Sequence, residues 1–315
     1  MTDFEVGTRE DPHAQPRAAR NAPVLLHSMS VFREIFEVVF TRREIRTVVE
    51  IGVESGQVSG IYAELGASEV YCVDPAPTER VRETVKAHDA LHLVTVPSPE
   101  VLPQLPVADL YVLDGDHNYA VVKGELAWIL EHAPDAVVAM HDVLWPWGRR
   151  DLYYEPSALS PRDRHPVSED GPTVWHDGLT PAGFVGLGAF TVAQQAGGER
   201  NGVLTAVEDV LAEHPDWRFE LVPAVFGMGL LYRTEHESAD GLQRALRPYT
   251  SSNLLAAMEN NRIALYTRVL QLQFEAAAQA GHLDELAGTV AVQRREIDRL
   301  TAELHRAWAV LRSGR

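Results

Sequence analysis

Apolar and polar residues alternate along this chain with two different periods, and together these periods predict an α/β fold. Apolar residues recur at helical spacing near 27–43, 57–65, 78–88, 118–132 and 201–214. The remaining apolar runs are short and typical of strands: 47–53, 69–75, 91–97, 108–115, 135–143, 217–224 and 226–233. Continuous apolar strands that alternate with helices indicate a parallel sheet covered on both faces, and the short turn before the last run indicates an antiparallel hairpin. We therefore predict a doubly wound sheet of seven strands whose last strand is antiparallel.

Two segments of the N-terminal three quarters lie outside this alternation. Residues 1–23 are polar, broken by proline and without a period, which predicts a mobile tail ahead of a domain that spans 24–236. Residues 144–200 interrupt that domain with a stretch rich in Pro, Gly, Trp, Tyr and His. A stretch of this length without a period is too long for an ordinary connection, so we expect a lid over a substrate site.

The C-terminal segment, 250–315, follows a third pattern. From Leu255 to Leu311, positions spaced alternately three and four residues apart form one unbroken heptad pattern. These positions are apolar except for Arg262, Gln279 and Gln293. The pattern predicts a long helix that forms a coiled coil and makes the chain a homo-oligomer, such as a dimer. The alternative is a pair of antiparallel helices that bend near residue 281 and fold back on the domain.

Composition and charge narrow the classes of partner. Acidic residues outnumber basic ones 45 to 28, giving a formal charge of −17, and this balance disfavours nucleic acid or an anionic membrane as a partner. The single cysteine, Cys72, cannot form an internal disulfide. No apolar run is long enough for a membrane helix, and the N-terminus does not resemble a signal peptide. We therefore expect a soluble, cytoplasmic protein.

The first predicted strand runs directly into a glycine-rich turn. Glu50, Gly52 and Gly56 follow the pattern E-x-G-x-x-x-G ahead of a helix, and glycines there let the backbone turn sharply and approach a ligand. Asp74 ends the second strand, where the ribose of a bound nucleoside would lie, since ligands of such sheets bind at the carboxyl ends of the strands. The turn and the acid together predict a nucleoside site.

A dense group of acids and histidines follows the fourth and fifth strands. The fourth ends with Asp114, Asp116 and His117, and the fifth with His141 and Asp142. Carboxylates placed close together resist ionisation unless a counter-charge is present, and a divalent cation is one answer. The other is a metal-free site in which His117 or His141 is a general base that the acids orient.

These motifs resemble the class I S-adenosylmethionine-dependent methyltransferases, over roughly residues 28–234. The resemblance implies a Rossmann-like fold that binds S-adenosylmethionine. It also implies roles for individual residues. Glu50, Gly52 and Gly56 would surround the methionine moiety, Asp74 would bind the ribose hydroxyls, and Ser98, after the third strand, would lie near the adenine.

The pairing of D-G-D-H-x-Y with H-D resembles one branch of that family, which includes macrocin and rhamnosyl O-methyltransferases and cephalosporin-hydroxylase-like proteins. By this resemblance Asp114, which also borders the cofactor, binds a metal together with His141 and Asp142. The imidazole at 141 departs from the usual second acid and favours a softer ion than Mg, such as Mn. We take Asp114, His117 and His141 as the candidate catalytic residues.

The resemblance predicts a metal-assisted O-methyltransferase that acts on a small molecule or glycan, at a hydroxyl of a sugar or another polyhydroxylated natural product. Two alternatives stay open. One is a metal-independent methyltransferase that uses a histidine base on a nitrogen, carboxylate or hydroxyl. The other is a ligand-binding module that recruits partners through its coiled coil.

The insertion offers candidate substrate contacts. Trp145, Tyr153 and Tyr154 have flat faces on which a sugar or aromatic ring can stack, and Arg149 with Arg150 can hold a phosphate or carboxylate. The opposite interpretation is that the aromatic side chains fasten the insertion to the domain and that the arginines pair with surface acids.

Overall fold

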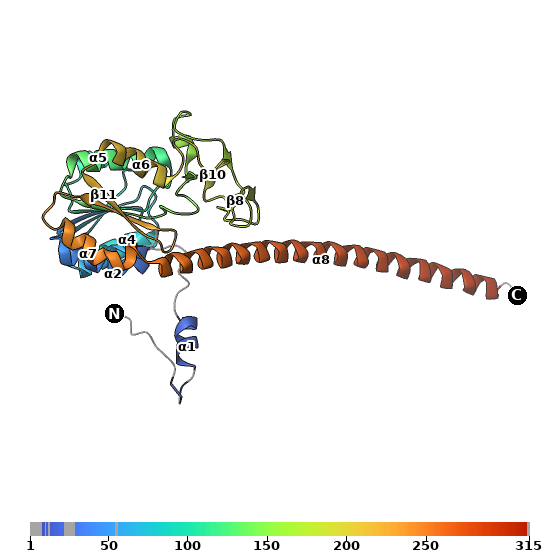
Figure 1. Ribbon diagram of the computed structural model, residues 1–315. Helices are drawn as coiled ribbons and strands as arrows, with labels where there is room; N and C mark the ends of the chain where they lie inside the picture. Colours follow the sequence, from blue (N-terminus) through green and yellow to red (C-terminus); the bar gives the residue numbers. More distant parts are fainter. Residues whose placement is uncertain (1–7, 10, 12, 22–28, 54–55, 314–315) are drawn as a thin grey trace. The chain divides into compact units, whose positions relative to one another are not determined.

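The computed structural model describes residues 8–9, 11, 13–21, 29–53 and 56–313. They form two compact units (Figure 1). The first unit contains the described residues up to Val167 together with Val192–Asn260, and the second contains Ser168–Thr191 together with the described residues from Asn261.

The first unit is built on the predicted seven-stranded sheet. Its strand order is β11-β12-β5-β4-β1-β2-β3, and β12 runs antiparallel to both β5 and β11. Pairs within β3-β2-β1-β4-β5 are all parallel. The sequence prediction of a last strand that is antiparallel is therefore confirmed. The bounds are β1 Thr47–Ile51, β2 Glu69–Val73, β3 Leu91–Val94, β4 Leu110–Leu113, β5 Val137–Met140, β11 Trp217–Val222 and β12 Met228–Arg233.

Helices cover both faces of this sheet. Helices α5 and α6 lie on one face, and α2, α4 and α7 lie on the other (Figure 1). Every residue of the central strands β4 and β5 is buried, which is why their sequences are continuously apolar. The helical bounds are η1 Met29–Phe32, α2 Arg33–Arg42, α3 Ser59–Glu64, α4 Glu79–Lys86, η2 Leu102–Gln104, α5 Tyr119–His132, α6 Val203–Glu213 and α7 Ala239–Thr250.

A side-chain cap sets the start of α5 next to the predicted acid and histidine group. The Asn118 side-chain oxygen accepts a hydrogen bond from the amide of Val121 at 3.0 Å. Such a cap satisfies one of the free amides of the first helical turn. The helix therefore begins immediately after His117, and the short link from β4 to α5 has little freedom.

The predicted N-terminal tail contains one regular element. Residues Ala14–Asn21 form α1, none of whose residues is buried. Most other positions of 1–23 lie outside the described residues, so the mobility of the tail stays a prediction. The helix was not expected, because Pro16 and the polar composition hide its period.

Short strands organise the insertion. Strands β6 (Leu152–Tyr153), β10 (Thr191–Ala193) and β7 (Val167–Ser168) form a three-stranded sheet, and η3 spans Pro156–Ala158. Strands β8 (Gly171–Pro172) and β9 (Leu179–Thr180) pair as a hairpin within the second unit. Strands of two or three residues are too short to show a period, so the sequence did not reveal them.

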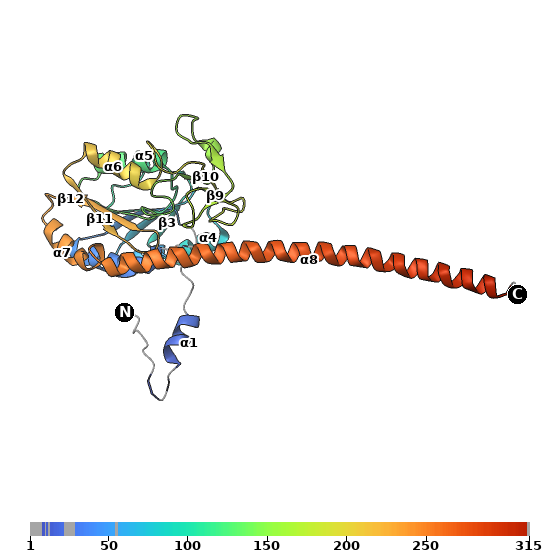
Figure 2. The same ribbon diagram turned by 45° about the vertical axis from the view of Figure 1, so that its right-hand side comes forward.

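The C-terminal segment is one continuous helix. Helix α8 spans Asn253–Ser313, 61 residues, or roughly 90 Å at 1.5 Å per residue (Figure 2). Its first turn is capped by the Ser252 hydroxyl, which accepts from the amide of Leu255 at 3.2 Å. The helix runs without a break through Gly281, so the alternative of two helices that bend there is wrong. None of the described helices combines the length and the apolar run that crossing a bilayer requires.

Candidate functional site

The carboxyl ends of β1, β2, β4 and β5 form one edge of the sheet. The residues just beyond these strands continue the hydrogen-bonding ladder: their amides donate to a carbonyl of the neighbouring strand at 2.8–3.0 Å. This holds for Gly52, Asp74, Asp114 and His141. The predicted glycine turn, the predicted ribose acid and the acid and histidine group are therefore fixed in register along a single edge.

Gly52 lets the loops after β1 and β4 touch. Its φ is +85°, and a Cβ atom added to it would lie 2.2 Å from the carbonyl oxygen of Asp114. Gly56 also has a positive φ, +71°, and its amide donates to the carbonyl of Val53 at 2.8 Å. Both turns need glycine, because other residues rarely adopt this backbone region.

Glu50 lies below this turn, at the end of β1, and is buried. The hydroxyl of Ser59, in α3, donates a hydrogen bond to its carboxylate. Burial raises the pKa of Glu50 to about 8, although the Ser59 hydroxyl opposes the shift. The carboxyl is therefore mostly protonated at neutral pH, and its predicted contact with a methionine moiety stays a prediction.

The two residues predicted to bind a nucleoside lie beyond β2 and β3. Asp74 is half-buried, and one carboxylate oxygen accepts from the amide of Ala76 at 2.9 Å. Ser98 precedes a cis peptide bond to Pro99, and its buried hydroxyl faces the carboxyl of Glu125, whose pKa it lowers against the effect of burial. The predicted contacts of Asp74 with a ribose and of Ser98 with an adenine stay predictions.

Asp114, His117 and Asp142 bring one ligand atom each to within 4.8 Å of one another. His117 and Asp142 are buried, and His117 Nε2 lies 3.3 Å from Asp142 Oδ2. Asp142 has a φ of +60°, and its Oδ1 is buried without a partner among the described residues. A strained backbone and an unsatisfied carboxylate oxygen are typical of a functional site rather than of a packed core.

His141 is held differently from His117. Its Nε2 donates to the carbonyl of Val225 at 2.8 Å, and its Nδ1 lies 3.1 Å from Asp114 Oδ1. Burial would lower the pKa of His141, but the carboxylates of Asp142 and Asp114 outweigh burial and raise the pKa to about 9. Both ring nitrogens of His141 therefore face hydrogen-bond partners inside the protein.

The predicted metal set of Asp114, His141 and Asp142 stays a prediction. His141 Nδ1 lies 3.1 Å from Asp114 Oδ1 and 3.7 Å from Asp142 Oδ2, and His117 is a second imidazole grouped with the same two acids. The same contacts argue against His141 as a general base and leave His117 as the candidate. Asp116 stands apart from the group, and burial raises the pKa of its carboxyl while His117 opposes the shift.

Three of the predicted substrate contacts are used inside the protein. Arg149 forms a bidentate ion pair with Glu208 of α6, in which its two terminal nitrogens lie 2.5 and 2.6 Å from the carboxylate oxygens. Arg150 is buried and donates to the carbonyl groups of Ala193 and Gln194. A substrate contact of either arginine stays a prediction. The sequence did not reveal their partners, Glu208 for Arg149 and two backbone carbonyls for Arg150, because these lie more than 40 residues away in the chain.

Tyr153 is the third predicted substrate contact whose side chain has a partner inside the protein. It is buried, and its hydroxyl donates to Asp151 Oδ2 at 2.7 Å. Tyr154, in contrast, is 52% exposed, and its ring centroid lies 6.3 Å from that of His117. Trp145 is half-buried, with its ring 6.1 Å from that of Phe226. Tyr154 and Trp145 therefore remain candidates for substrate contact.

Sequence reasoning missed two buried acids that support the site. The carboxylate of Asp151 accepts from the amides of Tyr119 and Gly202 at 2.8 and 2.7 Å, which ties the insertion to the first residue of α5. Glu259, near the start of α8, accepts from the amides of Val225 and Phe226, both at 2.8 Å. Neither acid belongs to a recognisable motif, because its partners are backbone amides of distant loops.

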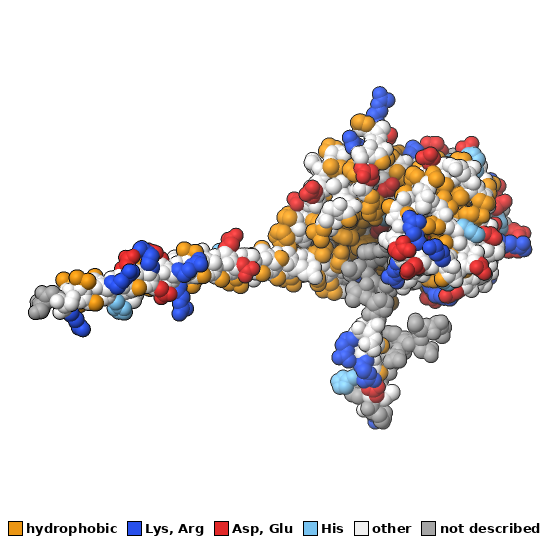
Figure 3. All heavy atoms as spheres, turned by 180° about the vertical axis from the view of Figure 1, so that it is seen from behind, with side chains coloured by type: hydrophobic (Ala, Val, Ile, Leu, Met, Phe, Trp, Pro, Cys, Tyr) orange, Lys and Arg blue, Asp and Glu red, His pale blue; other side chains and the backbone are white. Residues whose placement is uncertain are grey.

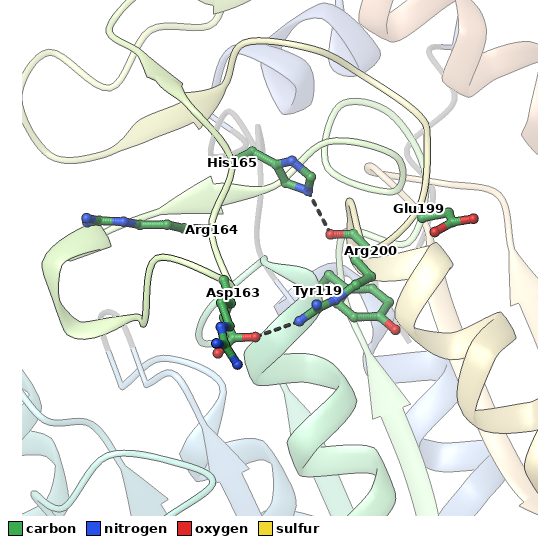
Figure 4. A pocket seen from close by; sticks show the side chains of 7 residues that line it. Tyr119, Asp163, Arg164, His165, Glu199 and Arg200 are labelled. Atoms are coloured by element: carbon green, nitrogen blue, oxygen red, sulfur yellow. Dashed lines mark hydrogen bonds and ion pairs between the residues drawn. The ribbon is translucent and has the colours of Figure 1, made fainter.

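A pocket of about 200 Å³ lies beside the start of α5 (Figure 4). An ion pair between Arg200 and Asp163 and a hydrogen bond between His165 and the Arg200 carbonyl cross it. None of the three clustered residues lines this pocket, so it is separate from the candidate site. Its lining residues are Tyr119, Arg162, Asp163, Arg164, His165, Glu199 and Arg200.

Comparison with known proteins adds a family match. A family model described as "Methyltransferase domain" matches residues 49–143, and no curated protein sequence matches the chain. The SAH-bound methyltransferase PaMTH1 of Podospora anserina is 17% identical, with a TM-score of 0.42, over 70% of this chain and 86% of that protein. Cofactor-bound Rv0187 from MTB is 16% identical, with a TM-score of 0.42, over 69% and 86%. The segment that carries Gly52, Asp74, Asp114 and Asp142 thus has the sequence signature of a methyltransferase domain.

Proposed function

We propose that this protein is an S-adenosylmethionine-dependent O-methyltransferase, assisted by a divalent metal, that methylates a hydroxyl of a sugar or another polyhydroxylated small molecule. One observation carries the proposal. The glycine turn at Gly52, the ribose acid Asp74 and the group of Asp114, His117 and Asp142 share one sheet edge, within the segment that matches a methyltransferase domain. Ligands of doubly wound sheets bind at this edge.

The group at Asp114, His117 and Asp142 fits a divalent cation. Two carboxylates and one imidazole form a donor set that suits Mn²⁺ or a similar ion. The unsatisfied Oδ1 of Asp142 supports this fit, because a buried carboxylate oxygen without a partner costs free energy that a cation would recover. A cation there would supply positive charge that makes a nearby hydroxyl more acidic.

The chain's own residues position the reactants. Methyl transfer from a sulfonium is an in-line displacement, so catalysis depends mainly on alignment and on removing the acceptor's proton. His117 is the ring suited to accept that proton in a metal-free reaction, since both nitrogens of His141 are hydrogen-bonded. The exposed ring of Tyr154, beside His117, offers a flat surface for a sugar or aromatic acceptor.

Calorimetric titration with S-adenosylhomocysteine tests the cofactor. We expect binding with a micromolar Kd in the wild-type protein. No heat at several hundred micromolar ligand would remove the methyltransferase proposal.

Electron paramagnetic resonance of added Mn²⁺ tests the metal separately. We expect one site per chain in the wild type, lost in Asp142→Asn and retained in Asp298→Asn, which changes an exposed acid of α8. If the wild-type protein binds S-adenosylhomocysteine but not Mn²⁺, Mg²⁺ or Zn²⁺, the metal-independent reaction with His117 as base replaces this mechanism.

A further inference from the structure

Helix α8 exposes a continuous apolar stripe along the part of it that lies in the second unit. Figure 3 shows apolar side chains spaced along the helix. The stripe residues are between 47 and 70% exposed. They are Leu265, Val269, Leu272, Leu283, Leu286, Val290, Ile297, Leu300, Leu304 and Leu311. Ten large apolar side chains in one heptad phase on one helix need a partner surface.

The two core positions of the heptad differ in composition. With Leu265 at position d, the other d positions on the stripe are Leu272, Leu286 and Leu300, all leucine. The a positions on the stripe are half β-branched and half leucine: Val269, Val290, Ile297, Leu283, Leu304 and Leu311. Leucine at d with β-branched residues at a favours a parallel pair of helices over larger assemblies.

The polar residues of the seam favour a second copy of the same chain. Gln279 and Gln293 both fall at position d, two heptads apart. In a parallel pair in register, each glutamine meets the same glutamine of the other copy, and two amides can satisfy each other. A shift by one or more heptads would bury at least one of these amides against leucine, which costs free energy.

The flanking charges are compatible with the same arrangement. In a parallel pair, position g of one helix meets position e of the other, five residues further along. These pairs, Thr289 with Arg294, Glu296 with Thr301 and their equivalents along α8, contain no two like charges. Arg299, on the outer side, makes ion pairs with Glu296 and Glu303 of its own helix.

We infer that α8 binds a second copy of this chain as a parallel, in-register, two-stranded coiled coil. The two chains then enter the coil at the same end, because the two helices run in the same direction. The inference does not depend on the proposed enzymatic function.

Sedimentation of the full-length protein tests the number of chains. We expect twice the chain mass of 34.9 kDa. Ile297→Asp, in the seam, should raise the dissociation constant at least 100-fold, whereas Ala302→Asp, on the outer side, should leave it unchanged. A monomer, a trimer or a tetramer of the wild type would overturn the inference.

Disulfide trapping tests the direction. Leu300→Cys should cross-link two copies under mild oxidation, because the same d residues face each other in a parallel pair, and Ala302→Cys should not. Native Cys72 is buried, so it gives little background. A dimer in which Leu300→Cys does not cross-link would refute the parallel arrangement.

A different observation carries a second inference, at the turn between β11 and β12. Val225, Phe226 and Gly227 all have positive φ, at 44°, 64° and 88°. A β-branched residue in this region is an outlier. The buried carboxylate of Glu259 accepts both the Val225 and the Phe226 amide, so it holds a turn that its own residues disfavour.

This turn connects α8 with the candidate site. The Val225 carbonyl accepts from His141 Nε2, and His141 Nδ1 faces Asp114. We infer that Glu259 is a positioning residue, which orients the His141 ring by holding the Val225 carbonyl. Only the consequence for catalysis at Asp114 rests on the proposed function.

Nuclear magnetic resonance of ¹⁵N-histidine-labelled protein tests this directly. The wild type should show a slowly exchanging His141 Nε2 proton, assigned by its loss in His141→Gln. Folded Glu259→Gln should lose or shift that signal by more than 0.5 ppm, and Glu285→Gln, an exposed position of the same helix, should not. If Glu259→Gln does not fold, Glu259→Asp takes its place. An unchanged signal in either folded variant, or no such proton in the wild type, would overturn the inference.

Discussion

Replacing Gly52 by alanine tests the close approach of the loops after β1 and β4. The new Cβ would lie 2.2 Å from the Asp114 carbonyl oxygen and 2.6 Å from the Gly115 Cα. Both neighbours are backbone atoms, so no side chain can rotate away and the loops must separate by roughly 1 Å, an overpacking that costs about 1–3 kcal/mol. The φ of +85° costs a further 1–2 kcal/mol or so for a residue with a Cβ.

Two other glycines separate these contributions. Gly66 has a φ of +117° but no atom within 4 Å of an added Cβ, so Gly66→Ala carries the backbone cost alone. Gly60, in α3, has open space and no positive φ, so Gly60→Ala should be neutral or stabilise by about 0.5–1 kcal/mol. For Gly52→Ala we expect about 2–5 kcal/mol of destabilisation, or roughly 5–15 °C in Tm.

Thermal and urea unfolding of the three variants measure these differences, and titration with S-adenosylhomocysteine measures their effect on the site. We expect Gly52→Ala to weaken binding and Gly66→Ala to leave it unchanged, because only Gly52 contacts the loop of Asp114. If Gly52→Ala unfolds within about 2 °C of Gly66→Ala, the argument from close approach is refuted.

Three further predictions concern charged groups. Asp74→Asn should weaken S-adenosylhomocysteine binding by roughly 10–100-fold, the loss of a charge-assisted hydrogen bond, with little change in Tm; equal affinity by calorimetry would contradict the ribose role. Burial raises the pKa of Glu50 and of Glu125 to about 8, so the folded state retains protons that the unfolded state releases near pH 4.5. The contribution of these two carboxyls to the unfolding free energy should therefore be largest below pH 4.5 and be lost as the pH rises through 8. Urea unfolding at pH 5.5 and at pH 9 should show this loss of stability. The difference between the two pH values should be smaller in Glu50→Gln. Arg149→Ala removes a largely exposed ion pair with Glu208 and should cost less than about 1 kcal/mol, without an effect on S-adenosylhomocysteine binding; a large loss of affinity would restore Arg149 as a ligand contact.

The sequence predicted the strands of the sheet well and their ends less well. Strand β1 was expected over 47–53 and spans Thr47–Ile51, and β2 was expected over 69–75 and spans Glu69–Val73. Residues such as Gly52 and Asp74 still donate to the neighbouring strand, but their backbones already turn into the loops. Hydrophobicity does not mark this change, because it records burial rather than the direction of the backbone.

The sequence alone places the acids of the candidate site but does not choose between its two imidazoles. Asp114 and Asp142 follow from position, since the carboxyl ends of neighbouring parallel strands meet at one edge of a sheet. Whether His117 or His141 joins them depends on the Val225 carbonyl, which is 84 residues from His141 in the chain. Only folding brings that acceptor to the ring.

The amino-acid sequence by itself determined the doubly wound sheet, the glycine turn and the heptad helix, because each depends on local period or on residues that follow one another along a single element. The tertiary structure alone decided which charged side chains have partners. Arg149 meets Glu208, Glu259 meets the turn at Val225, and the carboxylate Oδ1 of Asp142 meets no described partner. The physical reason is that hydrogen bonds and ion pairs act over a few ångströms between residues that the sequence holds far apart.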